Sequence, residues 1–276
     1  MKKHLPTVIL IVVFLTGLSL LLYPTVSDWW NSFHQTRAIA AYQEAVSALD
    51  EEDYEEIRNA AVAYNEELKS KLDPFHPTAE ETLRYNEMLN VAGNGIMGYI
   101  EIPLLRCELP FYHGTDEGVL AKAVGHIEGS SLPVGGNGTH CVLSGHRGLP
   151  SAKLFTDLDR LKEGDVFLLH VLEETLTYEV DQILIVEPDD ISALAVDENK
   201  DYCTLVTCTP YGVNSHRLLV RGHRIPNREG LIVVSADAVQ YDPRLIAPLV
   251  AVPFLVVLFL VLLFKKPRRK GTKGKE

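Results

Sequence analysis

Short apolar runs separated by glycine, proline and asparagine fill the chain from Met97 onward, and they restrict the folds open to it. Turn-forming residues bound each run, which is typical of β-strands. We expect strands at residues 98–102, 139–144, 165–171, 175–186, 202–207 and 217–222. Short strands at this spacing favour a mainly β fold, a closed or nearly closed barrel of about eight strands, because closure leaves no exposed strand edge. Within it, residues 154–161 are expected to form a helix.

The region before this barrel has a helical pattern. Apolar residues recur at helical spacing amid Glu-rich polar faces, at 38–42 and again at Ile57, Ala60, Ala61, Tyr64 and Leu68. The pattern predicts two amphipathic helices. Residues 72–77 interrupt it, because two prolines that flank an aromatic residue cannot continue a helix and instead favour an extended loop.

Two apolar segments of membrane-spanning length lie near the ends of the chain, at residues 5–23 and 245–264. Lysines precede the first, and a tail rich in Lys and Arg follows the second. By the positive-inside rule, both termini face the cytoplasm and the part between them lies outside. Trp29 and Trp30 fit the aromatic belt of the membrane interface. The first segment is either a retained anchor or a cleaved signal peptide, and the lack of a clear small-residue cleavage site favours the anchor.

These patterns divide the chain into successive segments. They are a cytoplasmic N-terminus (1–4), a transmembrane anchor or signal segment (5–23), an extracellular helical region (24–92) with a loop at 72–77, a β-barrel domain (93–230), a linker (231–244), a transmembrane helix (245–264) and a basic cytoplasmic tail (265–276).

The charge of the chain excludes one class of partner. Its formal net charge is −11, and nine of its 26 Lys and Arg residues lie in the two basic flanks. The part between the flanks is therefore more acidic than the net charge suggests. Binding to nucleic acid depends on Lys and Arg neutralising phosphates, so a nucleic-acid partner is not expected.

Three residues of complementary chemistry lie at the ends of predicted strands. One apolar run ends on Cys208, a Pro-Tyr-Gly turn follows, and the next run begins with Arg217. A third run ends close to His146. A thiol becomes a good nucleophile when it ionises, which nearby cations favour, and a histidine can transfer the protons. The sequence therefore predicts an acyl-transfer site built on these three residues.

The segments that carry these residues resemble one family. Residues 204–208 read Thr-Leu-Val-Thr-Cys, and 144–150 read Ser-Gly-His-Arg-Gly-Leu-Pro. Both resemble the sortases, the membrane-anchored cysteine transpeptidases of Gram-positive bacteria, and the resemblance extends over about residues 99–224. It implies a sortase-type eight-stranded barrel with a nucleophilic Cys208, a general acid/base His146, and Arg217 holding the substrate and the oxyanion. Arg221, Arg224 and His216 compete with Arg217 for that last role.

The loop at 72–77 indicates which class of sortase the chain resembles. Asp73-Pro74-Phe75 resembles the lid of class C, the pilin-polymerising sortases, and the second apolar segment is similar to theirs. The resemblance implies that Phe75 covers the nucleophile and that Asp73 contacts the active-site cations, so that the free enzyme blocks itself. The alternative is an ordinary turn that ends a helix.

The resemblance also implies the reaction. An LPxTG-like signal is cleaved between Thr and Gly, and the acyl group passes to a lysine of a pilin subunit at the outer face of the cell membrane, without a metal or organic cofactor. The alternatives are a sortase that anchors surface proteins to peptidoglycan, a hydrolytic cysteine peptidase, and a non-enzymatic membrane-anchored scaffold for pilus assembly.

The remaining cysteines form no CxxC pair, and the histidine spacing fits no zinc site. Cys141 and Cys203 each lie five residues before a proposed catalytic residue, on strands expected to be neighbours. Equal offsets place them at matching heights on one face. They are therefore either two buried free thiols or a cross-strand disulfide.

Overall fold

The computed structural model describes residues 5–227 and, beyond them, residues 252, 253, 255 and 257. The predicted linker, second transmembrane helix and basic tail thus lie outside the described residues, apart from those four positions. The chain divides into two compact units, Met1–Ser27 with Asp237–Glu276 and Asp28–Ala236. The second unit contains the β-structure.

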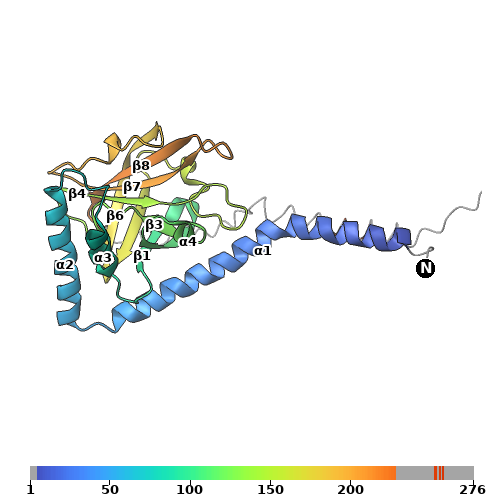
Figure 1. Ribbon diagram of the computed structural model, residues 1–276, viewed down its shortest axis with the longest axis horizontal. Helices are drawn as coiled ribbons and strands as arrows, with labels where there is room; N and C mark the ends of the chain where they lie inside the picture. The colour runs from blue at the N-terminus through green and yellow to red at the C-terminus, as the bar shows by residue number, and fades with distance from the viewer. Residues whose placement is uncertain (1–4, 228–251, 254, 256, 258–276) are drawn as a thin grey trace, which may run out of the picture. The chain divides into compact units, whose positions relative to one another are not determined.

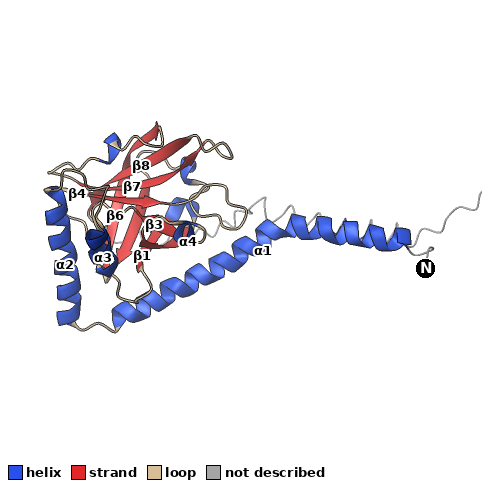
Figure 2. Ribbon diagram, viewed as in Figure 1, coloured by secondary structure: helices blue, strands red, loops and turns tan. Residues whose placement is uncertain are grey.

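Eight strands close into a barrel in the order β1-β2-β3-β4-β7-β8-β6-β5. Figures 1 and 2 show the strands as arrows beside α2 and α3. The predicted eight-stranded barrel is confirmed. The strands are β1 (Ile96–Ile102), β2 (Cys107–His113), β3 (Val124–His126), β4 (Thr139–Ser144), β5 (Val166–Val171), β6 (Glu174–Val186), β7 (Asp201–Thr209) and β8 (His216–Ile225). The six predicted strands match β1 and β4 to β8. The other two gave weaker signals, because β2 contains Pro110 and β3 has three residues.

The strand pairing brings distant segments of the chain together. β4 pairs with β7 in parallel, with Cys141 opposite Cys203 and Ser144 opposite Val206. β7 pairs with β8 antiparallel. Strands β4 and β7 therefore run side by side and end at the same rim of the barrel.

The barrel has an apolar interior and a smaller apolar cluster on its outer face. Leu143, Leu205 and Val220 are fully buried in the interior. The alternate positions Val142 and Val206 belong to the outer cluster, as expected for strands whose side chains alternate between faces. Both faces of this part of the sheet are thus apolar, and the outer one is covered by loops.

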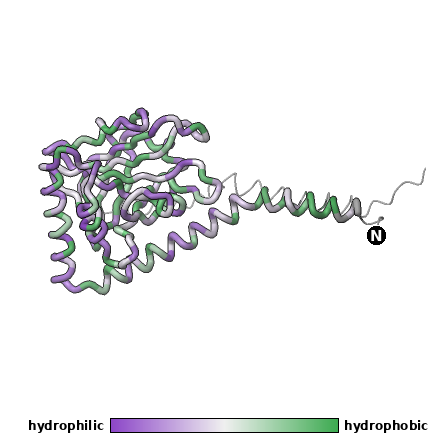
Figure 3. Tube along the Cα trace, viewed as in Figure 1, coloured by the Kyte–Doolittle hydropathy of each residue, from purple (hydrophilic) through white to green (hydrophobic). Residues whose placement is uncertain are grey.

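Three helices precede the barrel. α1 (Leu5–Ser47) is apolar in its first part (Figure 3), and it is the one described helix long and apolar enough to cross a membrane. α2 (Glu51–Lys69) begins after Asp50, whose carboxylate accepts a hydrogen bond from the Asp53 N–H. α3 (Ala79–Glu87) follows the loop 72–77. Ala61 of α2 and Tyr85 of α3 join the barrel's apolar core.

The helix predicted at residues 154–161 is wrong. A 3₁₀ turn, Leu158–Arg160, stands in its place. Leu154 has a φ of 37°, and the N–H of Phe155 donates to the carbonyl of His146, so the backbone cannot begin an α-helix there. The other short elements are α4 (Glu117–Leu120) and the 3₁₀ turns Pro103–Leu105 and Ser192–Leu194.

Candidate active site

The antiparallel ladder between β7 and β8 places Cys208 directly opposite Arg217. Side chains that oppose each other across two strands lie on the same face of the sheet, within reach of each other. The tight turn between the strands is held by the N–H of Asn214, which donates to the carbonyl of Pro210 at 2.9 Å. Cys208 is half-buried at the barrel rim.

His146 reaches the same rim through the parallel pairing of β4 with β7. The ladder continues past the last strand pair, because the Gly145 N–H donates to the carbonyl of Val206 at 3.0 Å. In return, the Thr207 hydroxyl donates to the carbonyl of Gly145 at 2.7 Å. His146 lies two residues beyond Ser144, as Cys208 lies two residues beyond Val206, and Ser144 is paired with Val206. The structure thus brings the three predicted site residues to one end of the barrel.

Arg217 is placed to act on an anion. Its guanidinium donates to the backbone carbonyls of His216 at 3.2 Å and Asn214 at 3.4 Å. Of the residues that the structure describes, no Asp or Glu lies within ion-pair distance of it. Its charge is therefore available to a developing oxyanion or a substrate carbonyl beside Cys208.

Arg221, a competing candidate, has different partners. It lies on the same face of β8 as Arg217, but both oxygens of the Asp181 carboxylate accept hydrogen bonds from it, at 3.0 and 3.1 Å. Its guanidinium also lies 4.2 Å from the centre of the Tyr202 ring. A bidentate ion pair stacked on an aromatic ring holds Arg221 in a structural role.

The two other competing candidates also have partners. His216 lies 3.3 Å from the Glu187 carboxylate. Arg224 lies 3.9 Å from the carboxylate of Asp201, and its ladder position is seven residues beyond the pair of Cys208 with Arg217. Arg217 remains the cation best placed beside the thiol.

Arg147 is a member of the site that the sequence reasoning did not single out. Its guanidinium donates to the hydroxyl of Thr209 at 3.2 Å and forms an ion pair with Asp159. It therefore ties the end of β7 to the loop that follows β4. The one sequence feature that could have pointed to Arg147 is its position directly after His146.

The predicted lid loop lies against the outer face of the sheet. Phe75 is partly buried on the outer cluster of Val142, Leu194, Val206 and Leu219. The Asp73 carboxylate lies 2.9 Å from Nδ1 of His76, and both side chains are largely exposed. The expected contact of Asp73 with the active-site cations is thus replaced by a contact within the loop.

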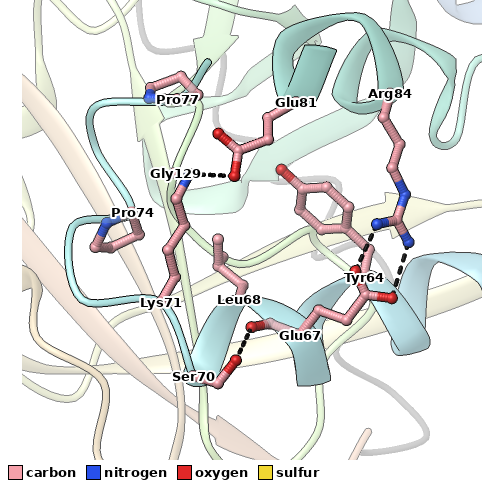
Figure 4. Close-up of a pocket in the computed structure, with 10 residues that line it drawn as sticks. All are labelled: Tyr64, Glu67, Leu68, Ser70, Lys71, Pro74, Pro77, Glu81, Arg84 and Gly129. Carbon is pink, nitrogen blue, oxygen red and sulfur yellow. Dashed lines mark hydrogen bonds and ion pairs between the residues drawn. The ribbon is translucent and has the colours of Figure 1, made fainter.

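Both ends of this loop are anchored beside a cavity of about 380 Å3 (Figure 4). Lys71 and Glu81, on either side of the loop, form an ion pair at 2.8 Å. Glu81 also accepts from the N–H of Thr78 and completes the capping box of α3. These hydrogen bonds lower the pKa of Glu81 to about 2, and the one from Lys71 has the largest effect. A Cβ on Gly129 would meet the carbonyl of Pro74 at 2.3 Å, so the loop packs backbone to backbone there.

Cys141 and Cys203 are register partners and free thiols in the barrel interior. Both are buried, and burial raises the pKa of the Cys203 thiol well above its ordinary value. Cys203 faces inward and Cys208 outward, because an odd number of positions separates them along β7. Burial likewise raises the pKa of Cys107 to about 12. Within the described part of the chain, no group of three or more His, Cys, Asp or Glu is arranged to hold a metal ion.

Comparisons with known proteins place the barrel in one family. The Sortase domain family matches residues 100–225. Sortase D of Bacillus subtilis (strain 168) is 36% identical over 131 residues, which cover 46% of this chain and 63% of that protein. The crystal structure of sortase C1 from Streptococcus agalactiae is 56% identical with a TM-score of 0.67, and the match covers 70% of this chain and 100% of that one.

A second solved structure is that of Streptococcus pneumoniae sortase C, described as giving insights into catalysis and pilin substrate specificity. It is 46% identical with a TM-score of 0.60, and the match covers 69% of this chain and 97% of that one. The match to the Bacillus subtilis relative spans less than two thirds of that protein. The two structures, in contrast, are matched over nearly their whole length.

Proposed function

Because this chain belongs to the sortase family, and within it to the class C sortases, we propose that it is a membrane-anchored transpeptidase that polymerises pilin subunits. It cleaves an LPxTG-like sorting signal between Thr and Gly and joins the acyl product to a pilin lysine. The observation that carries this proposal is the pairing of Cys208 with Arg217 beside the loop that holds His146.

The proposed reaction runs in two halves. The Cys208 thiolate attacks the carbonyl carbon of the Thr–Gly bond, and Arg217 stabilises the oxyanion of the tetrahedral intermediate. His146 donates a proton to the leaving glycine amine, and a thioacyl enzyme remains. The ε-amine of a pilin lysine then attacks the thioester and gives a proton to His146. An isopeptide bond forms, and the thiolate is restored.

The outer apolar cluster is the proposed binding site for the sorting signal. Val206 and Cys208 project from the same face of β7, so the cluster of Val142, Val206 and Leu219 leads along the sheet to the thiol. An apolar floor of this kind suits the Leu-Pro part of the signal. Phe75 packs on this floor, so the loop 72–77 must leave it before a signal can bind. We therefore assign Asp73, Pro74 and Phe75 to a lid that regulates access.

The acceptor and the location follow from the class. Streptococcus pneumoniae sortase C, to which the chain is similar, is described in terms of pilin substrate specificity, and this supports a pilin acceptor. The apolar part of α1 supports a lipid bilayer as the other partner. In the proposed topology the barrel lies outside the cell membrane and both termini face the cytoplasm.

Purified full-length protein, incubated with candidate pilins that carry LPxTG-like signals, tests the proposal. We expect covalent ladders whose linkages map to lysine by mass spectrometry and which Cys208→Ala abolishes. Cleavage of the signal without ladders would point to hydrolysis, and transfer only to peptidoglycan amines would point to cell-wall anchoring. Ladders that persist in Cys208→Ala would refute the assignment of the nucleophile.

A further inference from the structure

The loop that carries His146 is held on two sides, and one of these is α1. On the β7 side, Gly145 and Arg147 bond to residues of the strand, as described above. On the other side, the Asp28 carboxylate accepts a hydrogen bond from the N–H of Lys153 at 2.8 Å. The side-chain amide of Asn31 donates to the carbonyl of Ser151 at 2.6 Å. Each contact joins positions at least 120 residues apart in the chain.

These two contacts continue the face of α1 that packs on the barrel. Asp28, Asn31 and Gln35 recur at spacings of three and four residues, and the buried Ile39 and Tyr42 extend the same stripe. The polar side chains on this packed face of the helix form hydrogen bonds to neighbouring segments. Gln35 does this too, donating to the carbonyl of Lys122 at 2.8 Å, but that segment lies outside the His146 loop.

The braced segment is itself bonded to the histidine. Two residues after Lys153, the N–H of Phe155 donates to the carbonyl of His146 at 3.2 Å. The next residue, Thr156, accepts a hydrogen bond from the N–H of Gly148 at 3.1 Å. The segment 151–156 therefore folds back on 146–148. A shift of 151–153 away from α1 would be passed to the backbone of His146.

We propose that Asp28 and Asn31 are positioning residues that hold the His146 loop in register with Cys208. This rests on the proposed function, in which His146 transfers the protons. The two residues do not touch the reacting atoms. They lie on the helix whose earlier part is the apolar segment, so one helix would both anchor the enzyme and brace its general acid/base.

The chemistry of the two contacts allows an isosteric test. Asp28 must accept, so Asp28→Asn keeps the contact through its amide oxygen, whereas Asp28→Ala loses it. Asn31 must donate, so Asn31→Asp loses its contact and sets a carboxylate against the Ser151 carbonyl. Gln35→Glu is the matched control, because it makes the same amide-to-carboxylate change on the same helix face, opposite Lys122.

Two readouts on full-length protein in detergent micelles separate positioning from folding. The first is cleavage of a fluorescence-quenched Leu-Pro-Glu-Thr-Gly peptide as a function of pH. The second is the pH dependence of Cys208 alkylation by iodoacetamide, followed by mass spectrometry, which needs no turnover. We expect Asp28→Ala and Asn31→Asp to lower kcat about tenfold with little change in KM, and to move the pH midpoint of alkylation. Asp28→Asn and Gln35→Glu are expected to match the wild type in both, at unchanged Tm.

The outcomes distinguish this inference from the proposed function. If His146→Ala abolishes cleavage while Asn31→Asp and Asp28→Ala behave as Gln35→Glu does, the brace is refuted and the catalytic assignment stands. Equal losses in Asp28→Asn and Asp28→Ala would also overturn it, because the contact would then not depend on an accepting oxygen. If His146→Ala keeps full activity, the proposed function itself fails.

Discussion

Cys203 and Cys208 lie five positions apart on one strand, yet they have opposite environments. Cys203 faces the barrel interior, is fully buried and lies opposite another thiol, Cys141. Cys208 faces outward at the end of the strand, is half-buried and lies opposite the cation Arg217. Burial in the interior raises the pKa of the Cys203 thiol and keeps it inaccessible, whereas Cys208 lies at the rim beside a cation.

The two cysteines also differ in what covers them. The cover over Cys203 is the barrel itself, which opens only when the protein unfolds. The outer face that carries Cys208 is covered by a surface loop, 72–77, held by Phe75 packing and a few polar contacts at its ends. A covering loop can move without loss of the fold. What a cysteine can do therefore depends less on its chemical identity than on the face of the strand from which it projects and on how near it lies to the end of the strand.

The largest expected effect tests the two cysteines directly. Cys208→Ala should abolish thioacyl formation, because it removes the attacking sulfur. Cys203→Ala should leave turnover within a few-fold of the wild type and lower the free energy of unfolding by about 1 kcal/mol through the small cavity it creates. Mass spectrometry of the thioacyl enzyme and urea denaturation measure the two quantities. A Cys203→Ala protein that folds normally but cannot form the thioacyl enzyme would contradict the contrast.

The next effect compares Arg217 and Arg221, two arginines of β8, the strand that pairs with β7. Arg217→Ala should lower kcat about 10²-fold, the usual loss when an oxyanion donor is removed, and Arg217→Lys should restore part of it. Arg221→Ala should instead leave kcat nearly unchanged and lower Tm, because Asp181 then loses its partner. Steady-state kinetics and thermal melting separate them. A larger kcat loss in Arg221→Ala than in Arg217→Ala would reverse the assignment.

Opening the lid should change one cysteine and not the other. The double change Asp73→Ala with Phe75→Ala removes the side chain that packs on the outer cluster. Losing about 1.4 kcal/mol of apolar packing should raise Cys208 alkylation by iodoacetamide about tenfold. Cys203 should stay unlabelled in both proteins. Peptide mapping by mass spectrometry gives both rates, and an unchanged Cys208 rate would show that the loop does not limit access.

The smallest expected effect concerns the anchor at the end of the lid. The pKa of Glu81 is lowered to about 2 from an ordinary value of about 4.5, so its charged contacts stabilise the fold fully at any pH above about 4.5. That contribution should decline as pH falls from about 4.5 toward 2. Glu81→Gln should therefore melt slightly below the wild type at pH 7, and the difference should shrink at pH 3. Glu80→Gln, an exposed neighbour, is the control. A difference that grows on acidification would contradict the sign.

Much of the site could be predicted from local sequence. The pairing of Cys208 with Arg217 depends on two adjacent strands and one short turn, all within a few residues. The loop at 72–77 was evident from its prolines. The helix predicted at 154–161 failed because its backbone bonds to His146 and turns back, a contact that helical spacing does not record. Strands β2 and β3 were missed because their signals were short or interrupted by proline.

By itself, the sequence determined the strands, the alternation that separates inner from outer faces, and the hairpin that pairs a thiol with a guanidinium. These depend on periodicity and on neighbours in the chain. Only the tertiary structure decided that His146 joins them, since β4 and β7 meet in parallel after more than 50 intervening residues. It also decided that Arg221 is bound to Asp181 and that α1 contacts the His146 loop. Such contacts form when the barrel closes and the helix packs on it, and no local pattern specifies which distant groups then meet.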